Sequence, residues 1–148
     1  MLKLYLDVNI YNRPFDDQME VRIRLETIAI FSILQRIKNG DFGLLWSFMI
    51  DYENSLNPYD DVRVEIEMAT SLANNMVAHD EIVYNMAKEF ESKGIKPRDA
   101  VHLACAVKGN VDYFLTCDDK LIKKVSTMEI KNLKIMNPIR FVEEMEEK

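Results

Sequence analysis

The chain has few of the residues that mark specialised protein classes. Its 148 residues include two cysteines, four glycines, four prolines and one tryptophan. Two cysteines are too few for a disulfide framework, so we expect Cys105 and Cys117 to be small buried side chains. No run approaches the roughly 18 apolar residues of a membrane span. No basic segment followed by an apolar one resembles a secretion signal. We therefore expect a cytoplasmic protein without membrane contact.

Positive charge is also scarce. The sequence has 19 Lys and Arg against 25 Asp and Glu, a net charge of −6. This balance argues against a protein that binds nucleic acid through bulk electrostatics alone. It leaves room for a metal-dependent nuclease, because clustered carboxylates add negative charge that bound cations neutralise.

What remains is the composition of an ordinary globular protein. Hydrophobic residues make up 48% of the chain and charged residues 30%. The length suits one domain with one core, and no repeat, low-complexity tract or flexible linker interrupts it. We expect a single domain over residues 1–148.

Hydrophobic periodicity predicts the elements of the first half. Apolar runs of strand length cover Leu2–Leu6 and Phe42–Phe48. Between them, helical spacing runs from Leu25 to Ile37 and stops at Asn39-Gly40. After the second strand we expect a helix that carries Glu53, is capped by Ser47 or Asp51 and ends at Asn57-Pro58. Two amphipathic helices are expected to follow, over Val62–Met76 and Asp80–Phe90.

The second half continues the alternation. Pro97 suits a first helical position, and Gly109-Asn110 ends that helix. The other expected elements are strands at Tyr113–Thr116 and Leu133–Met136 and helices at Lys120–Val125 and Ile139–Glu147. Strands separated by helices predict an α/β fold whose mainly parallel sheet is covered on both faces.

Four acids stand where such a sheet binds ligands, at or near the carboxyl ends of strands. Asp7 follows the first strand directly, and Asp118 follows the third. Glu53 lies in the first turns of the helix after the second strand, and Asp99 begins its own helix. Periodicity alone does not bring the last two beside the first two.

Each acid also has an ordinary structural explanation. Asp7 suits a turn, and Asp99 suits the positive end of a helix dipole. Asp118 or Asp119 suits a helix N-cap, and a lone glutamate such as Glu53 is usually solvated.

Together, the four acids favour metal chemistry. Carboxylates gathered in one cleft repel each other unless a cation lies between them. A set of oxygen ligands suits Mg²⁺ or Mn²⁺ better than zinc. Such ions activate water and neutralise phosphate oxygens, so phosphodiester hydrolysis is the expected reaction class.

In order, the motifs resemble those of the PIN-domain family, which includes VapC-like toxin ribonucleases. The matching segments are Leu4-Tyr-Leu-Asp7-Val-Asn9, Asp51-Tyr-Glu53, Pro97-Arg-Asp99-Ala-Val-His-Leu-Ala104 and Tyr113-Phe-Leu-Thr116-Cys-Asp118-Asp119-Lys-Leu121. The resemblance runs from Leu2 to Phe141. It implies a three-layer α/β/α sandwich with a central, mainly parallel sheet.

The resemblance also implies roles for individual residues. Asp7, Glu53, Asp99 and Asp118 would be both the catalytic and the metal-binding acids, with Mg²⁺ or Mn²⁺ as cofactor. Asn9 and Thr116 would orient those carboxylates. Asp119 is expected to be a helix cap. Val8 departs from the family, since many members have Thr or Ser there.

The resemblance implies a metal-dependent endoribonuclease whose substrate is RNA. Such an enzyme could be the toxin of a toxin–antitoxin pair, and its expected partner is then an antitoxin protein. The expected assembly is a homodimer. A catalytically silent PIN-fold module that binds nucleic acid or protein is the alternative. Phosphoryl transfer through an aspartyl phosphate is a weaker enzyme reading, because Asp7-Val-Asn9 lacks a second acid.

Basic residues flank the predicted site, although an exposed lysine run is more often a solvated face. They are Arg13, Lys96, Arg98, Lys120, Lys123 and Lys124, and we expect them to contact RNA.

Two further features admit more than one use. His102 and Cys105 have zinc-like spacing, but only His79 and Cys117 remain as soft partners, so we expect His102 to pack beside Asp99 or to form a local hydrogen bond. A buried Cys105 is a poor nucleophile. The loop Asn12–Asp17 either connects elements or shapes a substrate entrance.

Overall fold

The computed structural model describes residues 1–130 and 132–147. Its centre is a five-stranded sheet in which every pair of neighbouring strands is parallel, in the order β3-β2-β1-β4-β5. The strands are β1 (Leu2–Leu6), β2 (Phe42–Ser47), β3 (Asn75–Val77), β4 (Tyr113–Leu115) and β5 (Lys134–Met136). The predicted α/β fold with a parallel sheet is confirmed.

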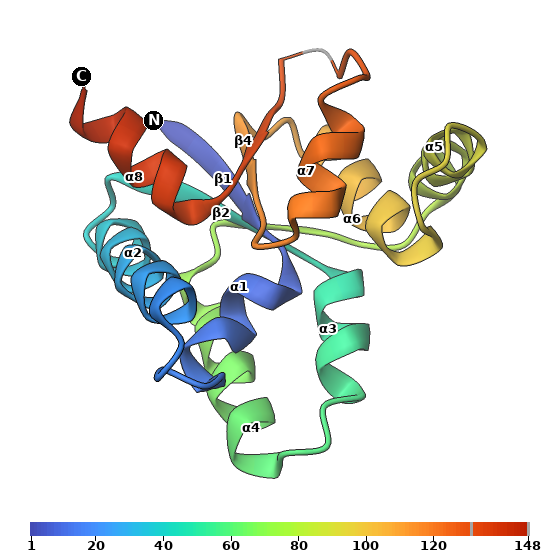
Figure 1. Ribbon diagram of the computed structural model, residues 1–148. Coiled ribbons are helices and arrows are strands. Elements are labelled where there is room, and N and C mark those ends of the chain that lie inside the picture. Colours follow the sequence, from blue (N-terminus) through green and yellow to red (C-terminus); the bar gives the residue numbers. More distant parts are fainter. Residues whose placement is uncertain (131, 148) are drawn as a thin grey trace.

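Helices cover both faces of this sheet (Figure 1). The α-helices are α1 (Val8–Asn12), α2 (Val21–Lys38), α3 (Phe48–Ser55), α4 (Asp60–Met68), α5 (Glu81–Ser92), α6 (Pro97–Lys108), α7 (Asp119–Val125) and α8 (Pro138–Glu146). Short 3₁₀ turns cover Arg13–Phe15 and Ala69–Leu72. Figure 1 shows α2 and α8 on one side of the sheet and α5, α6 and α7 on the other. In the part of the chain described, no helix is long and apolar enough to cross a bilayer.

The prediction for residues 62–76 is wrong in part. Helix α4 ends at Met68, and Asn75–Val77 forms the edge strand β3, a fifth strand that the sequence pattern did not predict. Only Val77 of this three-residue strand is buried, so the strand shows no alternation of apolar and polar residues that would distinguish it from an amphipathic helix. Asn74 fixes the entry to β3, because its backbone N–H donates to the Leu44 carbonyl and its Oδ1 accepts from the Leu44 N–H, both at 2.9 Å.

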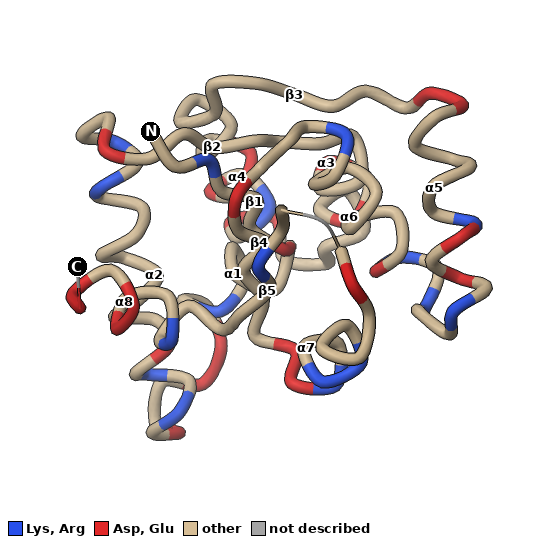
Figure 2. The backbone as a smooth tube through the Cα atoms, turned by 90° about the horizontal axis from the view of Figure 1, so that it is seen from above, with Lys and Arg blue, Asp and Glu red and all other residues tan. Residues whose placement is uncertain are grey.

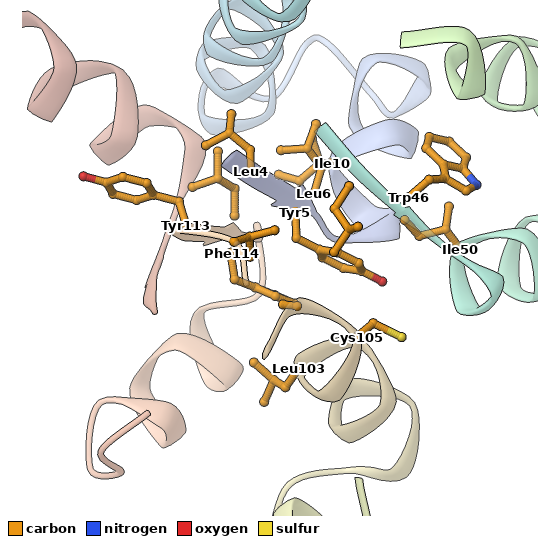
Figure 3. Close-up of a cluster of buried hydrophobic side chains, with 14 of the residues drawn as sticks. Leu4, Tyr5, Leu6, Ile10, Trp46, Ile50, Leu103, Cys105, Tyr113 and Phe114 are labelled. Atoms are coloured by element: carbon orange, nitrogen blue, oxygen red, sulfur yellow. The ribbon is translucent and has the colours of Figure 1, made fainter. Parts of the chain in front are cut away.

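The core lies on both faces of β1. Alternate side chains of a strand point to opposite faces, so Leu4 and Leu6 pack on one side and Tyr5 on the other. The Tyr5 ring stacks on Phe114 of β4 with 5.3 Å between centroids, and both are fully buried against α6 (Figure 3). Cys105 is buried in this layer and Cys117 is also buried, both as free thiols, as predicted.

The order of the strands determines where a ligand can bind. The chain passes from β1 to β2 and β3 on one side, and then crosses to β4 and β5 on the other. The carboxyl ends of β1 and β4 therefore flank the point at which the strand order reverses. This switch point is the usual ligand site of open parallel sheets. The Asp7 N–H donates to the Leu115 carbonyl at 3.0 Å and joins the two strand ends.

Gly109 lets the end of α6 approach β2 closely. A Cβ atom at this position would lie 2.2 Å from Cδ2 of Leu45, a side chain that is only 4% exposed. We expect Gly109→Ala to lower the free energy of unfolding by about 1–3 kcal/mol, because the core must shift to admit the methyl group. Urea denaturation measures this change. Lys108→Ala, at an exposed position one residue earlier, is the matched control, and equal stability of the two variants would contradict the packing argument.

Candidate active site

Asp7 is held firmly at the end of β1. It is the N-cap of α1, and its Oδ1 accepts the Val8 N–H at 2.8 Å. Its Oδ2 accepts from Oγ1 of Thr116 at 2.8 Å and from Nδ2 of Asn9 at 3.2 Å. The side chain is buried, with 4% of its surface exposed. Both carboxylate oxygens are thus fixed by donors from the start of α1 and from the residue directly after β4.

Asn9 and Thr116 join the start of α1 to the segment that follows β4. Asn9 Nδ2 donates to Thr116 Oγ1 at 2.9 Å, and Asn9 Oδ1 accepts the Cys117 N–H at 3.0 Å. Thr116 Oγ1 also accepts the Asp118 N–H at 3.1 Å. These contacts suit the role expected of Asn9 and Thr116, which is to orient the neighbouring carboxylates.

Glu53 reaches the same place from α3. Ser47 caps that helix by accepting the Ile50 N–H at 3.2 Å, as one of the two predicted caps. Glu53 Oε1 forms a hydrogen bond with His102 Nε2, and that nitrogen lies 3.8 Å from Asp7 Oδ1. One ligand atom from each of Asp7, Glu53 and His102 lies within 4.8 Å of the others.

Asp99 and Asp118 adjoin this trio on the side of α7. Asp99 lies in the first turn of α6, and Asp118 caps α7 by accepting the N–H groups of Lys120 and Leu121 at 3.0 and 3.2 Å. Both acids are half-buried and line a cavity of about 450 Å³. The prediction that Asp119 is a helix cap is wrong, because Asp118 takes that position. Asp119 instead pairs with Arg22 at 2.5 Å.

Electrostatics shows that the acids share one environment. Burial raises the pKa of the Asp99 carboxyl to about 6, and the charges of Asp7 and Asp118 add to the effect. Burial also raises the pKa of Asp7, although His102 and the donors Thr116 and Val8 oppose it. A cation among these carboxylates would remove the repulsion. The residues therefore fit a divalent metal ion.

Of the four predicted acids, Asp7 and Glu53 converge most closely, and Asp99 and Asp118 adjoin them. The sequence pattern did not place His102 in this group. The ring lies near enough to Asp99 to oppose the rise in the pKa of that carboxyl, which agrees with the expected packing, but its hydrogen bonds are not local, since its partners Tyr5 and Glu53 are 97 and 49 residues away in sequence. One signal could have found it, because Asp99 and His102 are three residues apart and share a helix face.

Both cysteines are buried free thiols. Burial raises the pKa of the Cys105 thiol to about 12, and burial raises that of Cys117 to about 12 as well. Neither thiol is a thiolate near neutral pH, so neither suits a nucleophile.

The expected basic residues divide into two groups. Arg13 pairs with Asp16 at 3.0 Å and with buried Glu26 at 3.1 Å, which keeps it within the structure. The others line two cavities that border the acids. Lys96, Lys120, Lys123 and Lys124 line the cavity of about 450 Å³, and Arg98 lines one of about 690 Å³ with Glu53, Asn12, Phe15 and Asp16. Three residues of the loop Asn12–Asp17 thus line a cavity beside Glu53, and its use as a substrate entrance stays a prediction.

The raised pKa of Asp99 predicts a stability change. Between pH 3.8, its ordinary pKa, and about 6, the folded chain holds a proton that the unfolded chain releases, so rising pH destabilises the fold. Without metal at pH 7.5, Asp99→Asn should raise the free energy of unfolding by about 1–2 kcal/mol, because one pKa unit corresponds to about 1.4 kcal/mol and solvent screens part of the effect. The gain should vanish near pH 3.5.

Urea denaturation in EDTA across this pH range measures the difference. Asp119→Asn is the control of opposite sign, because its hydrogen bond with Arg22 lowers the pKa of that carboxyl. A gain for Asp99→Asn that is equal at pH 3.5 and 7.5 would contradict the electrostatic explanation.

Comparison with known proteins gives a consistent fold. No protein-family model and no curated protein matches the chain. Among solved structures, VapBC2 from Rickettsia felis bound to a DNA fragment from the promoter has 17% identity and a TM-score of 0.56, covering 92% of this chain and 98% of the other. VapBC-1 from nontypeable Haemophilus influenzae has 16% identity and a TM-score of 0.58, covering 93% and 98%. At such identities the likeness concerns the fold, and the chain accordingly has the PIN-type α/β/α fold that its sequence motifs predicted.

Proposed function

We propose that the chain is a metal-dependent endoribonuclease. The observation that carries the proposal is the convergence of Asp7, Glu53 and His102, with ligand atoms within 4.8 Å of one another, at the switch point of a parallel sheet. Asp99 and Asp118 border the same place and share its electrostatics. The fold's likeness to chains of VapBC complexes supports a role as the toxin of a toxin–antitoxin pair.

The four acids would hold the ion, Mg²⁺ or Mn²⁺. When bound, such an ion lowers the pKa of a water molecule and neutralises charge on a phosphate oxygen. The chain's own contribution is to keep the ligands in place. The hydrogen bonds of Thr116, Asn9 and Val8 to Asp7 fix that carboxylate before any ligand arrives, so little reorganisation accompanies binding.

The two cavities beside the acids would receive the RNA chain. The cavity lined by Lys96, Lys120, Lys123 and Lys124 places four positive side chains next to Asp99. Figure 2 shows basic and acidic positions adjoining one another along α7. Lysines that share a cavity with the acids would contact the phosphates that flank the bond to be cut. Their positive charge would offset the negative net charge of the protein at this place.

The structure weakens the phosphotransfer alternative. An aspartyl phosphate forms on an accessible carboxylate oxygen, whereas Asp7 is 4% exposed and both its oxygens accept hydrogen bonds. The silent binding module remains the second candidate, and cleavage assays separate it from the enzyme. An antitoxin partner, a homodimer and a cytoplasmic location belong to the same proposal.

Cleavage should depend on Asp7. With Mg²⁺ or Mn²⁺ and a mixed single-stranded RNA, we expect Asp7→Asn to lower the cleavage rate at least about 100-fold, because removal of a charged ligand weakens both metal binding and electrostatic stabilisation. Glu67→Gln removes one exposed acid elsewhere and serves as the control. Gel analysis of the products measures the rate. Metal binding without cleavage by the parent protein would favour the binding module.

RNA affinity should depend on the lysines of the cavity. In an Asp7→Asn background, replacement of Lys120, Lys123 and Lys124 by Ala should weaken RNA binding and lower the salt slope by about 0.7 for each phosphate that the protein no longer neutralises. Fluorescence anisotropy at several salt concentrations measures both quantities. The control replaces Lys38, Lys88 and Lys108, which removes the same charge from other exposed positions. Equal affinities of the two triple variants at low salt would rule out the proposed role of these lysines.

A further inference from the structure

We propose that His102 is a nitrogen ligand of the metal site and that it makes the site prefer Mn²⁺ and similar transition ions over Mg²⁺. This inference deepens the proposed function and rests on the same site. It goes beyond the four acids, because it assigns a fifth, non-acidic side chain to the ion and predicts which ion binds best.

The position of the ring supports this role. His102 is 1% exposed, and its Nε2 forms a hydrogen bond with Glu53 Oε1 and lies 3.8 Å from Asp7 Oδ1. Ligands bound to one ion at about 2.0–2.2 Å lie roughly 3–4.4 Å apart, depending on the angle between them. The ligand atoms of these three residues lie within 4.8 Å of one another, a limit close to that range. Small side-chain movements would therefore let all three share one ion.

The opposite side of the ring is fixed by the core. His102 Nδ1 lies 2.5 Å from the Tyr5 hydroxyl, and that hydroxyl lies 2.7 Å from Ser47 Oγ. A hydroxyl can accept one hydrogen bond while it donates another, so Nδ1–H can donate to Tyr5 while Tyr5 donates to Ser47. In this tautomer Nε2 carries no proton, so on metal binding its lone pair would face the ion and would replace the hydrogen bond with Glu53. Metal-ligating histidines nearly always have their second nitrogen held in this way.

Three elements supply proposed ligands together with the residues that hold the histidine ring. The extended segment at the end of β1 presents Tyr5 and, two residues later, Asp7. Helix α3 carries Glu53, and Ser47 is its N-cap. Helix α6 carries both Asp99 and His102 on one face. The support for the histidine thus comes from the same elements that place the acids.

A nitrogen ligand changes the order of metal affinities. Mg²⁺ takes oxygen ligands almost exclusively, whereas Mn²⁺, Fe²⁺ and Co²⁺ accept imidazole nitrogen readily. A site with only carboxylates would bind Mg²⁺ and Mn²⁺ through the same ligands. With His102 included, the ratio of the Mn²⁺ to the Mg²⁺ affinity rises, and removal of the ring should reduce that ratio.

The test measures metal binding by the full chain in the absence of RNA. Pulsed electron paramagnetic resonance of bound Mn²⁺ detects the ¹⁴N coupling of a directly coordinated imidazole. We expect this coupling in the parent protein and in His79→Gln, since His79 packs against Phe48 with 5.3 Å between ring centroids. We expect its loss in His102→Gln, with about a 10- to 100-fold weaker Mn²⁺ affinity and a smaller change for Mg²⁺ in competition.

The outcomes separate this inference from the proposed function. Bound Mn²⁺ without ¹⁴N coupling in the parent protein would overturn the ligand role of His102, and RNA cleavage by the same sample would leave the nuclease proposal standing. Absence of any ion binding would overturn both. Should His102→Gln fail to fold, the spectrum of the parent protein still decides, because His79→Gln identifies the other source from which the signal could arise.

Discussion

A buried carboxylate at the end of the central strand is the constraint on which the arrangement of the site depends. Asp7 lies where β1 and β4 finish together, and each of its oxygens accepts at least one hydrogen bond. Those donors come from Val8, Asn9 and Thr116, so the start of α1 and the residue after β4 are joined through one side chain. Because Asp7 is fixed, the elements that carry the other acids have one point to converge on.

This convergence costs stability in the protein without metal. Burial raises the pKa of both Asp7 and Asp99, which means that the folded state disfavours their charged forms. The rest of the fold must supply the compensating free energy. The buried layer formed by Tyr5, Phe114 and helix α6 does so on one face of β1, and the same layer holds His102 in place. The packing of the core and the geometry of the site therefore depend on the same side chains.

The bonds of His102 illustrate how one core position can serve the site. Tyr5 is wholly buried and stacks on Phe114, yet its hydroxyl lies within hydrogen-bond distance of both Ser47 and His102. A phenolic hydroxyl in the core needs such partners. Satisfying it with the imidazole fixes the direction of the ring, and the free edge of that ring then points to Glu53 and Asp7.

The sequence alone determined the elements whose signals are local. The strand at Leu2–Leu6 and helix α6 (Pro97–Lys108) were predictable because an apolar run, an N-terminal proline and a C-terminal glycine act within a few residues. The order of the acids also pointed to a PIN-type fold.

Tertiary structure decided the rest. Strand β3 exists because β2 offers an edge to pair with, and Asp119 pairs with Arg22, 97 residues away in sequence. His102 joined the site because Glu53, 49 residues away, is brought against it by the packing of α3 on α6, and no local pattern carries that information.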